Sequence, residues 1–292
     1  MSAVGALLGR LLGPFTGGSR GFVPAPASAT ERRRAWAEDG FLAGGPLLSR
    51  REIATLRAEF DRVLVESSWP DHERIPVGER REFHRVSNLA RRSEAFAEVE
   101  RHPRLVELLS ELTGLEAFCV LLDQVQYKPP RIGGRNAWHR DQPSFPLAPP
   151  YTGLTAWIPL DDATVRTGCM WMVPGSHRWG DARDVAVEGD GWGLPGVDDL
   201  TEYHGHPVRS VPRPVRAGHV HFHHELTWHM SGRNGTRHKR RAVAIHYVGA
   251  NDRYLANRWT KLEGLRDGDP LEGVLPLASR AGGAPAPRPP AG

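Results

Sequence analysis

The chain has 292 residues, of which 39% are hydrophobic and 25% charged, and its 38 basic and 34 acidic side chains leave a net charge of +4. These are ordinary values for a globular protein, and no apolar run reaches the ~18–20 residues that a membrane span needs. Only three of the basic residues are lysines, so the arginine excess reflects a GC-rich coding sequence, and we expect neither a nucleic-acid nor a membrane partner.

The two ends of the chain differ from its middle in composition. Residues 1–29 are rich in Gly, Ala and Pro, and we expect a disordered leader. A targeting segment is the alternative, because Arg10 and Arg20 occur there without any acidic residue. The tail, residues 278–292, has a similar composition and is also predicted to be disordered. Residues 30–277 are predicted to form a single domain.

Helical periodicity marks two segments in the first half of the chain. The sequence Ser49-Arg50-Arg51-Glu52 has the pattern of a capping box, and apolar residues follow it at helical spacing, which predicts a helix over residues 50–67. A second helix is predicted over His102–Thr113, with four leucines on one face and Gly114 as its end.

After Gly114 the sequence changes to short β-like runs separated by Pro and Gly. The predicted strands are Ala117–Lys128, Leu154–Leu160, Met170–Val173, Pro207–Val211, His219–His224 and Arg241–Val248. Many short strands of this kind are typical of a β-sandwich or barrel. Helices followed by strands predict an α+β chain built on an antiparallel β core. The long, Gly-rich segment Arg178–His206 is predicted to be a lid or substrate loop.

The stretch Trp138-His139-Arg140-Asp141-Gln142 carries a candidate metal site. If it is a β-strand, the side chains of His139 and Asp141 leave the same face, because a strand alternates sides at every residue. A third ligand would then come from a strand facing them across the core. Two histidines and one carboxylate on one face of an octahedron leave three positions open, which suits non-heme Fe(II) chemistry.

The candidates for the third ligand lie between Gly218 and Ser231. This segment holds five histidines, at positions His219, His221, His223, His224 and His229. Spacing does not choose among them, and any one taken singly is more often an ordinary core or surface histidine. His219, His221 and His223 share one strand face, so they could also form a metal-binding patch of their own.

Several short motifs follow one another in a set order between about residues 38 and 250. They are Asp39-Gly40-Phe41-Leu42, Gln124, Tyr127-Lys128-Pro129-Pro130, the Trp138–Gln142 stretch, Trp157-Ile158-Pro159-Leu160-Asp161-Asp162-Ala163, Gly168-Cys169-Met170, Val173-Pro174-Gly175-Ser176-His177-Arg178, His229-Met230-Ser231-Gly232-Arg233-Asn234 and Arg240-Arg241-Ala242. In order and spacing, this set resembles the phytanoyl-CoA dioxygenase family of Fe(II)/2-oxoglutarate oxygenases.

The resemblance implies a fold and a ligand set. The fold would be a double-stranded β-helix (a cupin-like jelly roll) with the N-terminal helices packed on one sheet. The iron ligands would be His139, Asp141 and His229. The carboxylate at Asp141 matters for the reaction, because related halogenases carry a small residue there and bind chloride instead. The resemblance therefore implies hydroxylation rather than halogenation.

The resemblance also implies how 2-oxoglutarate would bind. Arg240 would grip its far carboxylate through two charge-assisted hydrogen bonds. Arg241 is the competitor, and because neighbouring residues of a strand face opposite sides, only one of the two can point at the iron. Ser231, Gln124 and Trp157 would line the cosubstrate, although Trp157 could equally be a core aromatic residue.

We therefore predict a dioxygenase that uses Fe(II), 2-oxoglutarate and O2 to hydroxylate a small organic acid, acyl thioester or specialised metabolite, with release of succinate and CO2. The alternative is a non-catalytic jelly-roll protein that binds a metal or ligand, and a Zn-dependent hydrolase ranks below both. The substrate wall is expected to come from Gln142–Tyr151, Arg178–His206 and Trp69–His84. Cys119 and Cys169 are predicted to be buried thiols, which suits a reducing compartment such as the cytoplasm. We expect a monomer or a homodimer.

Overall fold

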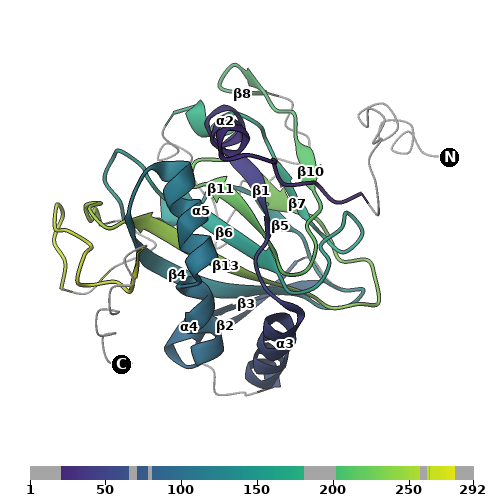
Figure 1. Cartoon of the computed structure of the whole chain (residues 1–292). Helices are drawn as coiled ribbons and strands as arrows, with labels where there is room; N and C mark the ends of the chain where they lie inside the picture. Colours follow the sequence, from purple (N-terminus) through teal and green to yellow (C-terminus); the bar gives the residue numbers. More distant parts are fainter. Residues whose placement is uncertain are drawn as a thin grey trace.

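The computed structural model describes these parts of the chain: residues 21–65, 71–77, 81–180, 202–256, 262 and 264–279. Two β-sheets face each other, and helices cover the outer side of the larger sheet (Figure 1). Within these parts, no helix combines the length and the apolar character of a membrane span. Most of the predicted leader and of the predicted tail lies outside the described residues.

The α-helices of the described parts precede most of the strands. They are α2 (Ala29–Asp39), α3 (Arg50–Val65), α4 (Glu94–Glu100) and α5 (Pro103–Thr113), with 3-10 turns at Leu89–Arg91, Gln142–Ser144 and Ser176–Arg178. The predicted capping box opens α3, since Ser49 and Glu52 bond each other's backbone N–H groups. Gly114 ends α5 in the left-handed conformation with φ 77°, which glycine adopts without strain. Helices α2 and α4 were not among the predicted elements.

The larger sheet is antiparallel throughout. Its strands, in spatial order, are β1 (Phe41–Pro46), β11 (His219–His224), β6 (Leu154–Pro159), β13 (Arg240–Gly249), β4 (Ala117–Lys128), β3 (Glu82–Ser87) and β2 (His72–Pro76), and β14 (Leu277–Ser279) also pairs with β4. The smaller sheet has the order β10 (Val211–Arg213), β7 (Met170–Met172), β12 (His229–Ser231) and β5 (Asn136–His139). A hairpin of β8 (Glu202–Tyr203) and β9 (His206–Pro207) stands apart. The arrangement is the predicted jelly roll.

Strand β13 shows how the larger sheet separates its two faces. Val243, Ile245 and Tyr247 belong to the apolar cluster that packs against the helices. The alternate residues, such as Ala244 and His246, point to the inner face, toward the smaller sheet. Burial of both faces explains why all ten residues of this strand are buried. The helices therefore stabilise the outer face, and the inner face carries both an apolar cluster and the polar side chains of the cavity.

Three sequence expectations differ from the structure. The domain begins before residue 30, because the Val23 N–H donates to the Pro214 carbonyl over 3.2 Å and the Phe22 ring lies 4.9 Å from the Arg216 guanidinium. It extends past residue 277, because β14 runs to Ser279. The predicted strand Pro207–Val211 is two strand ends with a gap between them, because Pro207 pairs with β8 whereas Val211 pairs with β7 in another sheet.

Candidate active site

The predicted metal ligands come together at one end of the smaller sheet, but not in the predicted way. His139 is the last residue of β5, and Asp141 lies beyond it with helical backbone angles (φ −75°, ψ −33°). The Asp141 N–H donates to the Glu225 carbonyl over 3.0 Å, which turns the chain out of the strand. The expectation that both side chains leave one strand face is therefore wrong. Their approach depends on the turn that follows β5.

His229 is also placed differently from the expectation. It lies on β12, which pairs directly with β5, and His229 and His139 are partners in the register. The third residue therefore comes from a neighbouring strand of the same sheet, not from a strand across the core. Antiparallel partners carry their side chains on the same face, which brings the two imidazole rings to 4.0 Å between centroids.

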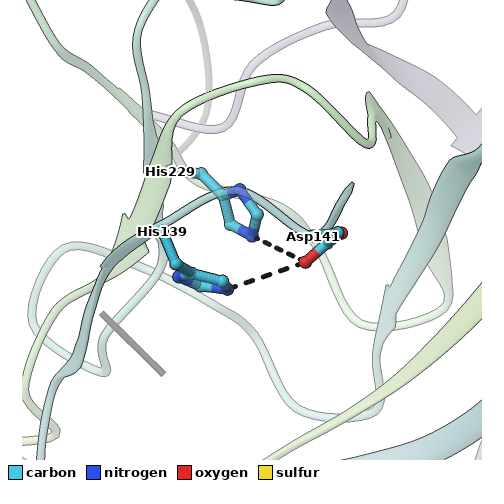
Figure 2. A group of neighbouring side chains, drawn as sticks. All are labelled: His139, Asp141 and His229. Atoms are coloured by element: carbon cyan, nitrogen blue, oxygen red, sulfur yellow. Dashed lines mark ion pairs between the residues drawn. The ribbon is translucent and has the colours of Figure 1, made fainter. Parts of the chain in front are cut away.

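The three side chains converge on one point (Figure 2). Asp141 Oδ1 lies 3.7 Å from His139 Nε2 and 3.7 Å from His229 Nε2. One donor atom of each residue lies within 4.8 Å of the others, and no other three His, Cys, Asp or Glu residues meet this criterion in the described part of the chain. Two imidazole nitrogens and one carboxylate oxygen are a donor set that suits non-heme iron.

Backbone carbonyls set the tautomer of both imidazoles. His139 Nδ1 donates to the Ala137 carbonyl over 2.8 Å, and His229 Nδ1 donates to the Thr227 carbonyl over 2.9 Å. Each ring therefore presents the lone pair of Nε2 toward Asp141. Burial lowers the pKa of both histidines, which favours the neutral, metal-binding form. Burial alone would raise the pKa of the Asp141 carboxyl, but His229 and a hydrogen bond from His223 hold it well below its usual range.

The other histidines of β11 do not form a separate surface patch. His221 and His223 are fully buried on the inner face, and His219 and His224, at the two ends of the strand, are partly exposed. His221 Nε2 accepts a hydrogen bond from Arg213 Nε over 3.3 Å, and His223 Nε2 lies 3.1 Å from Asp141 Oδ2. His223 therefore belongs to the same site as Asp141, and its ring lies 4.4 Å from that of His229.

The two arginines that begin β13 point to opposite sides, as neighbours on a strand must. Arg240 is fully buried, and Nη1 donates to the Gln126 carbonyl over 3.2 Å. Its Nε and Nη2 atoms have no hydrogen-bond partner among the described residues. Arg241 instead pairs with Asp161 over 2.8 Å and with Asp61 over 3.0 Å. Burial lowers the pKa of Arg240 to about 9, so its guanidinium stays charged at neutral pH.

A second buried cation lies beside Arg240. Lys128 is its register partner on β4, and Lys128 Nζ donates to the carbonyls of Gly134, Ser231 and Gly232 over 2.7, 3.2 and 2.6 Å. Burial and the Arg240 charge lower the pKa of Lys128. Three carbonyl acceptors nevertheless require three N–H groups, so we assign the ammonium form. This inner region therefore carries excess positive charge, which suits an anionic ligand.

A small cavity joins two of the ligand candidates, Asp141 and His229, to two of the predicted cosubstrate residues. It is lined by Gln126, Asn136, Asp141, Thr155, Trp157, Met170, His223, His229, Met230, Ser231 and His246. Trp157 and Ser231 line it, and the buried Ser231 Oγ has no partner among the described residues. Gln124 does not line it, because its amide is bonded to His246. Gln126 was missed, although it shares a strand face with Gln124; its Oε1 accepts from Trp157 Nε1 over 3.2 Å.

The expected substrate wall is described only in part. Gln142–Tyr151 is described, whereas most of Arg178–His206 and part of Trp69–His84 lie outside the described residues. Within the first of these, Phe145 packs its ring 5.3 Å from that of His246. The described part of the wall therefore contacts the strand that carries Arg240.

Comparisons with known proteins agree on one family. The sequence pattern described as "Phytanoyl-CoA dioxygenase (PhyH)" matches residues 36–242. The peroxisomal phytanoyl-CoA dioxygenase of Rattus norvegicus is 25% identical over 261 residues, which span 80% of this chain and 72% of the relative. A phytanoyl-CoA dioxygenase domain-containing protein of Bos taurus is 31% identical over 153 residues, about half of each chain.

Solved structures extend the likeness to bound cofactors. The epimerase SnoN, in complex with Fe3+, α-ketoglutarate and nogalamycin RO, has a TM-score of 0.71 and 28% identity, over 85% of this chain and 97% of its own. The α-ketoglutarate-dependent carbocyclase SnoK has a TM-score of 0.69 and 28% identity, over 88% of this chain and 100% of its own.

Proposed function

The chain belongs to the phytanoyl-CoA dioxygenase family and is a 2-oxoglutarate-dependent non-heme iron oxygenase that acts on a small molecule, and we propose that His139, Asp141 and His229 hold its iron. The donor set supports the assignment. Both imidazoles direct an Nε2 lone pair, and the carboxylate directs Oδ1, toward one point. Three protein ligands leave room on the metal for a bidentate cosubstrate and O2.

We propose that Arg240 binds the far carboxylate of 2-oxoglutarate. The supporting observation is that this fully buried guanidinium leaves Nε and Nη2 unpaired among the described residues. Buried donors are rarely left unpaired, and a carboxylate accepts two parallel N–H groups from one guanidinium. The Ser231 hydroxyl is a further unpaired buried donor and is assigned to the same ligand. Trp157 is assigned to the wall of the cosubstrate pocket, because its ring lies 5.7 Å from the Arg240 guanidinium.

We further propose hydroxylation of a C–H bond in a small organic acid, acyl thioester or specialised metabolite. When bound, iron with 2-oxoglutarate and O2 supplies an oxidant that removes a hydrogen atom, and succinate and CO2 are released. The chain's own residues orient the cosubstrate and keep the reaction away from water. A carboxylate at position 141 supports hydroxylation over halogenation, because it fills the place that a halide would need.

A second outcome, epimerisation or ring closure of the substrate, is favoured by the likeness to SnoN and SnoK. Both outcomes would consume 2-oxoglutarate and O2 and release succinate, and epimerisation, which does not oxidise the substrate overall, would also take two reducing equivalents from an added reductant such as ascorbate. Product analysis by mass separates them, because hydroxylation adds one oxygen atom, whereas epimerisation leaves the mass unchanged and ring closure removes two hydrogens. A cytoplasmic location stays a prediction; the two buried cysteines, Cys119 and Cys169, are unpaired, which supports it.

Succinate formation tests the ligand assignment. Purified protein with Fe(II), 2-oxoglutarate and O2 is expected to form succinate, and Asp141→Ala is expected to form none above background. Addition of 2-oxoglutarate to the anaerobic Fe(II) protein should also produce a new absorption band in the wild type only. Equal succinate formation in both proteins would refute the assignment of Asp141. Absence of the band and of succinate in the wild type would favour a non-catalytic binding protein.

A further inference from the structure

The second oxygen of the Asp141 carboxylate has its own set of partners. Thr155 Oγ1 lies 2.6 Å from Asp141 Oδ2, and His223 Nε2 lies 3.1 Å from the same atom. The first oxygen, Oδ1, instead faces the two ligand histidines. The carboxylate is thus divided: one oxygen is held by the protein and the other is directed at the candidate metal position.

The bond from Thr155 is the end of a chain of hydrogen bonds whose direction can be assigned. The Gln124 amide nitrogen is only a donor, so His246 Nε2, 3.0 Å away, must be the acceptor. His246 Nδ1 therefore carries the proton and donates to Thr155 Oγ1 over 2.8 Å. The Thr155 hydroxyl then has its own hydrogen free to donate to Asp141. The order of donation is Gln124, His246, Thr155, Asp141.

These partners sit on the most regular part of the fold, whereas Asp141 does not. Gln124, His246, Thr155 and His223 lie on β4, β13, β6 and β11, which are neighbouring strands of the larger sheet. Thr155 is the register partner of both His246 and His223. Asp141 lies in a turn beyond the end of β5. Because a turn alone restrains its side chain weakly, the facing sheet is what defines the orientation of the carboxylate.

The four side chains that lead to Asp141 are all buried. Thr155 and His223 are 1% exposed, His246 5% and Gln124 7%. Polar side chains at such positions are costly unless they are hydrogen-bonded, and apolar residues would pack the same face. The bonds of both Thr155 and His223 end on one atom, Asp141 Oδ2. The cluster is therefore built around Asp141 rather than around sheet stability.

We propose that Thr155 and His223 are positioning residues, with His246 and Gln124 behind Thr155, and that they hold Asp141 as a one-oxygen ligand with Oδ1 turned to the metal. The proposal rests on the assignment of Asp141 as an iron ligand. Outer partners of metal ligands fix the direction and basicity of the ligand, and their loss typically costs about 10–100-fold in metal affinity. Metal binding, not turnover, is thus the property that these residues control.

Matched substitutions separate positioning from packing. Thr155→Val keeps the shape of the side chain but removes the donor, and Thr155→Ser keeps the donor. His223→Gln places an amide donor near the position of Nε2, whereas His223→Asn, of equal polarity, is too short to reach Asp141. Tyr247→Phe is the control, because it removes an equally buried hydroxyl bond, to the Glu100 carbonyl, on the helix-covered face of the same sheet.

The measurement is the Fe(II) dissociation constant of the anaerobic full-length protein, by competition with a fluorescent chelator, together with the absorption band of the Fe(II)–2-oxoglutarate complex. We expect Thr155→Val and His223→Asn to weaken Fe(II) binding by about 10–100-fold and to shift the band. Thr155→Ser, His223→Gln and Tyr247→Phe should stay within a few-fold of the wild type. Melting temperatures of the metal-free proteins show whether each variant folds. If Thr155→Val does not fold, His223→Gln and His223→Asn can still be compared with each other.

The possible failures are distinguishable. If the wild type binds no Fe(II), or if Asp141→Ala binds it equally well, the ligand assignment itself is wrong. If Asp141→Ala loses Fe(II) but Thr155→Val and His223→Asn bind like the wild type, the positioning role is refuted. The positioning role also fails if His223→Gln and His223→Asn are equally impaired, because the effect would then not depend on a donor that reaches Asp141.

Discussion

Replacing Arg240 by methionine is expected to weaken 2-oxoglutarate binding and, at the same time, to make the metal-free protein more stable. Arg240 is fully buried, and within the described parts of the chain only its Nη1 has a hydrogen-bond partner, the Gln126 carbonyl. A buried donor left unpaired costs about 1–3 kcal/mol, and a charged one costs more. Methionine fills a similar volume without that cost, so the free energy of unfolding should rise by ~1–3 kcal/mol.

The same substitution should weaken the binding of 2-oxoglutarate, although it stabilises the metal-free protein. Two charge-assisted hydrogen bonds from Nε and Nη2 to a carboxylate are worth about 1.5–3 kcal/mol each, or roughly 3–6 kcal/mol together. At 1.4 kcal/mol per factor of ten, the KM for 2-oxoglutarate should rise by between about 100-fold and 10,000-fold. The assays are succinate formation against 2-oxoglutarate concentration and urea unfolding of the metal-free protein.

Arg241→Met is the matched control on the next residue. It breaks the ion pairs to Asp161 and Asp61 and should lower the free energy of unfolding by about 1–3 kcal/mol. The loss is smaller than for a fully buried pair, because the Asp61 side chain is 40% exposed. Its KM for 2-oxoglutarate should not change. An unchanged KM in Arg240→Met, or a loss of stability in it as large as in Arg241→Met, would refute the reasoning.

Three further predictions concern stability. Lys128→Met should destabilise the protein by more than ~2 kcal/mol in urea unfolding, because it leaves three buried carbonyls without their donor; a stability equal to the wild type would contradict the ammonium assignment. Burial lowers the pKa of His224 to about 3, so below pH 6.5 the unfolded chain binds one more proton at this residue than the folded chain does. This residue should therefore lower the free energy of unfolding by ~1.4 kcal/mol for each pH unit between pH 6.5 and pH 3, and His224→Gln should remove that contribution from the slope. Fe(II) at 100 times its dissociation constant should add ~2.7 kcal/mol to the stability of the wild type, and a chelator or Asp141→Ala should abolish this gain in thermal unfolding.

Much of the fold was predictable because local patterns and tertiary packing agree. The runs Ala117–Lys128 and His219–His224 form strands with the predicted bounds, and Gly114 ends α5. The helices α2 and α4 were missed for different reasons. Helix α2 has no buried residue and hence no apolar periodicity to detect, and α4 has only seven residues. The boundary at residue 30 was wrong because the contacts of Phe22 and Val23 are with residues almost two hundred positions away.

The choice among the histidines of β11 and β12 depended on the resemblance, not on spacing. Five histidines in a short segment have similar local surroundings, and the pairing of β12 with β5 is what brings His229 next to His139. The same limit applies to the two glutamines of β4. Gln124 and Gln126 share one strand face, but the position of His246 on β13 engages the first and leaves the second at the cavity.

The amino-acid sequence by itself determined the residue types of the site and the alternation that separates Arg240 from Arg241, because strand periodicity is a local property of the backbone. Only the tertiary structure decided that Asp141 leaves its strand, that His229 is a lateral neighbour of His139, and that Thr155 and His223 hold the second carboxylate oxygen. Those relations join β-strands far apart in the chain, and hydrogen bonds across a sheet have no signature in the spacing of residues along one strand. The local sequence therefore sets the residue types of the site, whereas contacts between distant segments set their arrangement.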